Sequence, residues 1–501
     1  MSLKQLLYSK QSALILFIIG ITLYLNFGYN FAREHFYTLL AIYTVLFGSF
    51  IVLLKSPHLS IKQLTYIAFS YRALFILVIP NLSQDFYRFI WDGRLIFEGI
   101  NPYLYTPDAI MSWSTVPIAE AKALHNGMGY LSAMHFSNYP PLNQLLFYLA
   151  ALLSSKSILG SVIVLRCFII AADFGTLYFG QRILKHLNLN PKVIFWYVLN
   201  PFIIIELTGN LHFEGVMIFF LVASFYYLFK HKWILSAVLL GCSISIKLLP
   251  LLFLPLFFWW FLKRKKVSNR EVSTALKLTS NKSQELLDKN AIPFEQTFKP
   301  TESQLGSKTS KSILLKNLGQ ISGFYAITLL VVVVSFLPFL SKDLINNYTK
   351  TIGLWFGNFE FNASIFNMFK YIGYEVSGKN QIKLISKITT TAVILMLLAL
   401  SFFRKNHKPK TLMLSCLFLL SFYLFTTSTV HPWYLATILL LSVFTHYKYI
   451  VVWSFTIFLS YYTYTQPDFK ENHWVLALQY APVFLVLFWE LFFNKKQTAK
   501  I

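Results

Sequence analysis

The chain has 501 residues, of which 56% are hydrophobic and only 13% are charged, whereas about a quarter of the residues of a soluble domain carry a charge. This composition excludes an ordinary soluble protein and indicates a polytopic membrane protein. The net charge of +24 comes from short basic clusters between apolar runs. That pattern is typical of positive-inside topology and not of a nucleic-acid-binding stripe, so we expect no nucleic-acid partner. The three cysteines lie inside apolar runs without metal-ligand spacing.

Apolar runs recur along the whole chain and predict an all-α, polytopic transmembrane helical bundle. Several are shorter than the ~20 residues of a perpendicular span, and we expect roughly 12 to 14 spans. The runs are residues 12–27, 36–54, 64–80, 160–180, 193–207, 215–229, 233–246, 248–262, 318–340, 384–403, 411–426, 433–444, 449–464 and 474–493.

The basic clusters between the runs predict how the chain is oriented. They all fall on one side if the N-terminus is cytoplasmic, which places both termini in the cytoplasm. To keep this register, residues 142–153 must not cross the membrane, and we expect an interfacial or re-entrant helix there. The outer side then carries two long loops, residues 81–159 and 341–381.

These loops divide the chain into two transmembrane modules joined by a linker. Residues 1–262 form the N-terminal module with the outer loop 81–159, and residues 318–501 form the C-terminal module with the loop 341–381. Residues 263–317 between them are polar, basic and poor in aromatics, which predicts a flexible cytoplasmic linker with a short helix near residues 280–289.

The start of the first outer loop, SQDFYRFIWDGRLIFEGINPY, contains four ionisable residues directly after an apolar run. Asp85, Arg88, Asp92 and Arg94 are costly beside a bilayer unless they serve chemistry or form pairs. We favour Asp85 as a general base, because it follows a span and its carboxylate is expected to be partly desolvated. For Asp92 and Arg94, an ion pair that pins the loop is an equally good interpretation.

A second polar group, in ELTGNLHFEG, is expected on the same outer side. It comprises Glu206, Asn210, His212 and Glu214. Two ligands at the spacing of His212 and Glu214 are weak support for a metal site without a third, so hydrogen bonding to an acceptor or within the loop is the preferred interpretation.

Lys247 and His431 each stand at the outer end of a later span. Lys247 either neutralises a lipid phosphate as a point charge or extends toward the headgroups, and the sequence leaves both uses open. His431 precedes Trp433 and Tyr434, whose rings suit an apolar chain or a sugar. We favour a function for His431 over a structural interfacial role.

Three further charged residues, Arg72, Arg166 and Asp173, fall inside apolar runs. We expect them to pair within the bundle and not to touch substrate.

Taken together, five segments resemble the bacterial GT-C glycosyltransferases, and most closely their mannosyltransferase-like branch that uses polyprenyl-phosphate sugars. The segments are SQDFYRFIWDGRLIFEGINPY, YPPLNQLLF, GNLHFEGVMIFF, SIKLLPLLFLPLFF and HPWYL. One departure is that two spans precede residues 64–80, where many relatives have one in total.

The resemblance implies a bacterial inner-membrane enzyme that transfers a sugar with inversion from a polyprenyl-phosphate donor to a lipid-linked or glycan acceptor on the outer face. Carried over, the acid near the acceptor is Asp85, and His431 is a second candidate for handling protons. No cofactor or metal is expected. The residues assigned to the donor phosphate or the substrate are Arg88, Arg94, Lys247, Asp92, Asn210, His212, Glu214, Trp433 and Tyr434.

Two other classes of function remain as alternatives. A transporter or flippase of lipid-linked glycans would place its charges near the membrane midplane, often in two repeated halves. A polymerase or ligase of lipid-linked glycans is closer to the sequence, because it would use the same kind of lipid-borne substrate.

Overall fold

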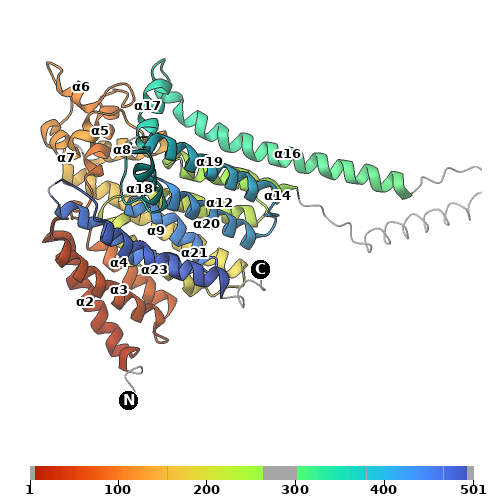
Figure 1. Cartoon of the computed structure of the whole chain (residues 1–501), viewed down its shortest axis with the longest axis horizontal. Coiled ribbons are helices and arrows are strands. Elements are labelled where there is room, and N and C mark those ends of the chain that lie inside the picture. The colour runs from red at the N-terminus through yellow and green to blue at the C-terminus, as the bar shows by residue number, and fades with distance from the viewer. Residues whose placement is uncertain are drawn as a thin grey trace, which may run out of the picture.

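The computed structural model describes residues 6–262 and 302–493, except for the single positions 155, 358, 380 and 467. Over these ranges the chain is all-α and forms a polytopic helical bundle (Figure 1), which confirms the predicted fold class. Apart from one isolated backbone bridge between Phe361 and Thr429, the described residues contribute no β-structure.

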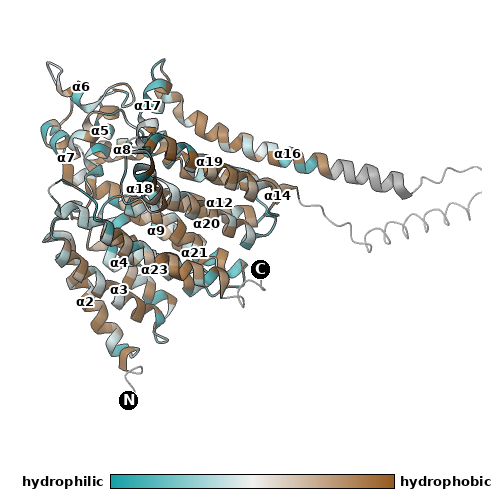
Figure 2. Cartoon of the chain, in the orientation of Figure 1, coloured by the Kyte–Doolittle hydropathy of each residue, from teal (hydrophilic) through white to brown (hydrophobic). Residues whose placement is uncertain are grey.

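Seven of the described helices are long and apolar enough to cross a membrane, and their apolar residues colour much of the bundle brown in Figure 2. They are α2 (Lys10–Tyr29), α3 (Phe36–Lys55), α9 (Ile158–His186), the Leu314–Phe339 region that contains most of α16 (Glu302–Phe336), α19 (Ile382–Phe402), α20 (Pro409–Thr426) and α23 (His473–Phe492). A pair of segments, Pro191–Val198 and Pro201–Gly209, makes an eighth if it counts as one span bent by 50°.

Shorter apolar helices make up much of the remaining bundle. They are α8 (Pro141–Ser154), α12 (Glu214–Phe229), α13 (Trp233–Ile246), Leu249–Phe261 with α14 (Phe258–Phe261), and Pro432–Val443 with α21 (Leu435–Val443). The helix α22 (Tyr449–Thr456) continues into a tighter helix, Ile457–Thr465. The predicted 12 to 14 spans are reached only if such short helices are counted as well.

The bend at residue 200 follows from local chemistry. Pro201 has no N–H to continue the preceding helix, and the side chain of Asn200 instead accepts a hydrogen bond from the backbone N–H of Phe202 at 3.0 Å. A new helical segment therefore begins there and ends in a π-helical turn, Ile204–Gly209.

The structure corrects the prediction of one continuous span over residues 64–80. The helix α4 covers only Ile61–Ala73, and tight turns follow, with the N–H of Phe75 bonded to the carbonyl of Arg72 and the N–H of Val78 to that of Phe75. Arg72 lies in the last turn of α4 and is fully buried. Hydropathy alone read this segment as one span, although its helix stops after 13 residues.

Both loops that were predicted to be outer contain helices, and these gather at one end of the bundle. The first loop carries α5 (Asp85–Phe97), α6 (Pro107–Met111), α7 (Ala121–Ala133) and α8, and the second carries α17 (Leu344–Gly357) and α18 (Ile365–Ser377). Asn347 donates to the carbonyl of Tyr103 at 3.0 Å, which ties the two loops together. In Figure 1, α2 begins and α23 ends away from α5, α6, α7 and α17. Which end faces the cytoplasm stays a prediction.

The predicted linker is only partly covered by the described residues. Residues 263–301, including the helix expected near 280–289, lie outside them. Residues 302–317, by contrast, belong to α16, which begins at Glu302 inside the segment predicted to be a linker.

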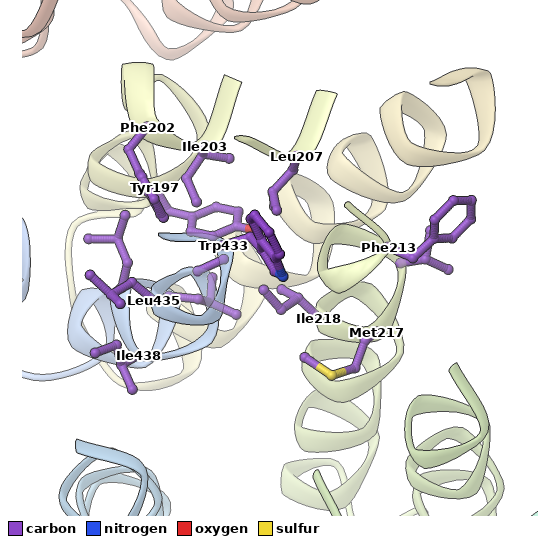
Figure 3. Packing of buried hydrophobic residues seen from close by; sticks show 14 of the residues in the cluster. Tyr197, Phe202, Ile203, Leu207, Phe213, Met217, Ile218, Trp433, Leu435 and Ile438 are labelled. Atoms are coloured by element: carbon purple, nitrogen blue, oxygen red, sulfur yellow. The ribbon is translucent and has the colours of Figure 1, made fainter. Parts of the chain in front are cut away.

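The apolar core continues up to the polar residues of the candidate site. In Figure 3, Trp433 packs among Leu207 of the bent segment and Ile218 of α12, with Tyr197 beside them. Trp433 thus brings the C-terminal module against the N-terminal one, immediately next to the candidate site.

Candidate functional site

The buried pair Arg88 and Asp92 fixes α5 to its neighbours. Arg88 Nε lies 2.7 Å from Asp92 Oδ1, four residues along the helix. The other carboxylate oxygen of Asp92 accepts from Ser137 Oγ at 2.5 Å and from Gln144 Nε2 at 2.9 Å. Charge-assisted hydrogen bonds of this kind are the strong ones. Asp92 therefore connects α5 to the N-terminal part of α8.

Arg94 has a different partner from the one considered in the sequence. Its Nη2 lies 3.1 Å from Glu120 Oε2, and its Nη1 donates to the carbonyl of Ala119. Residues two apart on a helix do not face each other, so Asp92 and Arg94 form no ion pair with one another. Arg88 and Arg94, predicted to bind substrate, are both engaged by protein groups in the structure.

Asp85 is the first residue of α5 and lies close to Lys247 and Glu214. Its surroundings raise the pKa of its carboxyl to about 6, mainly through burial; the charge of Lys247 lowers this pKa and that of Glu214 raises it. The residue is still partly exposed. Among the described residues, no side chain forms an ion pair or hydrogen bond with its carboxylate. A carboxylate with these properties suits a general base near neutral pH.

Lys247 is the first extended residue after α13, and Glu214 is the first residue of α12. Lys247 Nζ lies 2.5 Å from Glu214 Oε1, and 21% of the lysine side chain is exposed. The ammonium thus points to a carboxylate of the bundle. Since an ammonium has three N–H donors and Glu214 takes one, the others are available to a further anion.

Two histidines and a tryptophan form a ring stack next to this pair. The ring centroid of Trp433 lies 3.6 Å from that of His212 and 4.6 Å from that of His431, with interplanar angles of 18° and 3°. Two imidazoles this close and this parallel to one indole would overlap if they shared a face. They must therefore lie on its opposite faces, so Trp433 presents its edge and not its face to a ligand.

Both histidines of the stack are neutral at pH 7. Burial, and then the nearby charge of Lys247, lower the pKa of His431 to about 3 and that of His212 far below its usual value. The two ring nitrogens of His212 and Nδ1 of His431 have no hydrogen-bond partner among the described residues. His431 is partly exposed, so a ligand can reach its ring, whereas His212 is fully buried.

The polar residues of the bent segment have structural partners. Asn210 Oδ1 accepts from the backbone N–H of Leu82 at 3.2 Å and so positions the start of the first outer loop. Glu206 Oε1 accepts from the hydroxyl of Tyr461 at 2.8 Å. In the described ranges, no group of three His, Cys, Asp or Glu residues is placed to hold a metal ion.

Sequence reasoning missed Arg33 and Tyr464. Arg33 stands between α2 and α3, its guanidinium lies 4.4 Å from the ring centroid of Tyr464, and its Nη2 is 3.5 Å from Gln84 Oε1, one residue before Asp85. One signal was available: Arg33 falls on the predicted outer side, where the positive-inside rule disfavours basic residues.

Part of the chain is similar in sequence to known proteins. Residues 23–263 match the family described as "Alpha-(1->6)-mannopyranosyltransferase, N-terminal domain". That range includes Asp85, Glu214 and Lys247 but not His431. The match supports the mannosyltransferase-like part of the resemblance seen in the sequence, whereas the GT-C type and the polyprenyl-phosphate donor stay predictions.

Two relatives are similar to part of the chain. An alpha-(1->6)-mannopyranosyltransferase A of Mycobacterium tuberculosis is 21% identical over 189 residues, covering 38% of this chain and 35% of the relative. One of Corynebacterium glutamicum is 22% identical over 190 residues, covering 37% and 36%. The chain thus matches about a third of the length of these curated relatives. No solved structure matches the chain.

Proposed function

We propose that this protein is an integral membrane mannosyltransferase that transfers mannose with inversion from a polyprenyl-phosphate donor to a hydroxyl of a lipid-linked or glycan acceptor on the outer face of the membrane. The observation that carries the proposal is the carboxylate of Asp85. It has no protein partner among the described residues, its pKa is close to neutral, and Lys247 lies near it. The mannosyltransferases among the relatives support the choice of sugar.

The reaction needs a base and a site for the leaving phosphate. Asp85 takes the proton of the acceptor hydroxyl as its oxygen attacks the anomeric carbon, while the bond from that carbon to the phosphate oxygen breaks. In a single displacement the base and the leaving group stand on opposite faces of the sugar, which inverts the anomeric centre. The free N–H groups of Lys247 stabilise the charge that develops on the phosphate.

A carboxyl-to-amide substitution tests the proposal. Asp85→Asn keeps the shape of the side chain but removes its ability to accept a proton, and loss of a general base typically costs roughly 10²–10⁴-fold in rate. The measurement is mannose transfer by purified protein from a polyprenyl-phosphate mannose to a panel of acceptors.

The matched control is Glu98→Gln, which removes an exposed carboxylate at the C-terminal end of the same helix. It should leave transfer unchanged. Activity of Asp85→Asn within about threefold of the parent, at equal folded protein, would remove Asp85 from the role of base.

A further inference from the structure

The cations around Asp85 differ in how far protein carboxylates neutralise them. Lys247 forms an ion pair with Glu214, and Arg88 forms one with Asp92. The ion pair of Arg33, by contrast, is with Glu34 at 3.6 Å, and the side chain of Glu34 is 61% exposed. Screening by water makes such a pair weak. Of these three cations, Arg33 is therefore the one whose charge is least balanced by the protein, and Tyr464 lies within the electrostatic reach of both Arg33 and Asp85.

A chain of ring contacts joins Arg33 to the stacked histidines. Its guanidinium lies over Tyr464, whose ring centroid is 6.2 Å from that of Phe361. The Phe361 ring in turn lies 5.1 Å from His431, which stacks on Trp433. Arg33 and His431 thus border the same outer region of the bundle, although they come from opposite ends of the sequence.

Gln84 links Arg33 to the first outer loop. Its side-chain oxygen faces the guanidinium at 3.5 Å, and its amide nitrogen donates to the carbonyl of Met128 at 3.1 Å. Because Asp85 follows directly, the guanidinium is held beside the start of α5. The Arg33 side chain is 24% exposed and remains reachable from outside.

The charges around Asp85 indicate that binding a phosphate requires a further cation. Asp85 and Glu214 carry two negative charges and Lys247 one positive charge, so a phosphate entering this cluster meets a net negative site unless another cation takes part. A guanidinium already ordered on an aromatic ring loses little freedom when it binds a phosphate with two parallel N–H bonds.

We propose that Arg33, held on Tyr464, is a phosphate-binding residue of the site and engages the phosphate ester of the lipid-linked sugar. This inference rests on the proposed function and adds to it the contribution of the loop between α2 and α3.

The test measures donor KM and kcat in phosphatidylcholine nanodiscs containing a polyprenyl-phosphate mannose, for the parent, Arg33→Gln and Arg33→Lys. Removing a hydrogen bond to a charged group should raise donor KM about tenfold to a hundredfold in Arg33→Gln with little change in kcat. Arg33→Lys keeps the charge without the planar fork and should fall between.

Arg182→Gln is the matched control, because Arg182 also lies over a tyrosine, Tyr178, but near the far end of α9. Its donor KM should stay within about twofold of the parent, as expected for an exposed cation–π contact. An unchanged donor KM in Arg33→Gln overturns the proposal. So does a loss of kcat and thermal stability without a change in KM, which would mark a structural role.

Two further arms separate the sources of phosphate and the two proposals. If Arg33→Gln differs from the parent only when phosphatidylglycerol is added to the nanodiscs, Arg33 binds bulk lipid and the proposal fails. If the parent transfers no mannose, the proposed function fails, and equilibrium binding of polyprenyl phosphate then tests Arg33 alone. Weaker binding by Arg33→Gln supports the proposal, and equal or absent binding by both proteins overturns it.

Discussion

Two groups of charged residues in this protein, one inside the bundle and one at the end that carries α5, differ in what balances them. Inside the bundle, Arg72 Nε lies 2.7 Å from Asp173 Oδ2, and both side chains are 0% exposed. At the end that carries α5, Lys247 pairs with Glu214 but stays partly exposed, and Asp85 beside them has no partner for its carboxylate among the described residues.

The difference separates charges that hold helices together from charges that remain available to a ligand. Arg166 belongs to the first kind, because it donates to the carbonyls of Thr208, Gly209 and Ile76 and so closes the end of the bent segment. These backbone groups would otherwise be costly to bury. The prediction that Arg72, Arg166 and Asp173 find partners within the bundle is confirmed.

The largest expected effect is on stability and comes from breaking the buried ion pair between Arg72 and Asp173. Asp173→Asn leaves the charge of Arg72 buried without its counterion and should destabilise the protein by about 3–5 kcal/mol. The measurement is the yield of folded protein and the midpoint of unfolding in detergent. The double variant Arg72→Met with Asp173→Leu should recover most of the loss, since replacing both partners by apolar groups is often neutral.

Equal damage in the single and double variants would show that the geometry of the pair, and not its charge balance, matters.

The next effect is on the pH dependence of transfer. Asp85 acts as a base only when ionised, and its pKa is raised to about 6. Transfer should therefore fall as the pH drops through about 6, by about tenfold per pH unit below it. Because the charge of Lys247 lowers this pKa, Lys247→Met should move the fall to higher pH, whereas Glu214→Gln should move it to lower pH.

Steady-state rates from pH 4.5 to 8.5 in the three proteins provide the measurement. Profiles that coincide would show that the titration belongs to another group.

A smaller effect concerns Lys247 and His431 together. Lys247→Met should weaken donor use, and His431→Asn should lower transfer by removing a neutral hydrogen-bonding group. Because Lys247 lies close enough to His431 for its charge to act there, the two substitutions should combine non-additively if both side chains meet the same phosphate, with a coupling of about 0.5–3 kcal/mol. Donor titrations of the single and double variants measure it.

Strictly additive losses would mean that the two residues serve separate steps. Lys247→Met removes a cation and also leaves Glu214 without its ion-pair partner. To separate these two effects, the same titration is run in the double variant Lys247→Met with Glu214→Gln.

The sequence by itself determined the class of fold and indicated that polar residues from separate segments gather at one end of the bundle. Apolar runs and basic clusters depend only on local composition, so they indicate membrane helices without knowledge of packing. Asp85, Glu214 and Lys247, from three separate segments, were all predicted to reach one face, and the structure brings them together. Their catalytic and binding roles stay predictions.

Only the tertiary structure decided which groups are partners. Asp92 forms its ion pair with Arg88, and Arg94 forms one with Glu120. Helix geometry and the packing of α5 against its neighbours determine these pairs. The stacking of His212 on Trp433 depends on contact between residues more than 200 positions apart in sequence, and so does the place of Arg33 over Tyr464. Local sequence patterns show how polar a segment is, but long-range packing determines which group each charged side chain contacts.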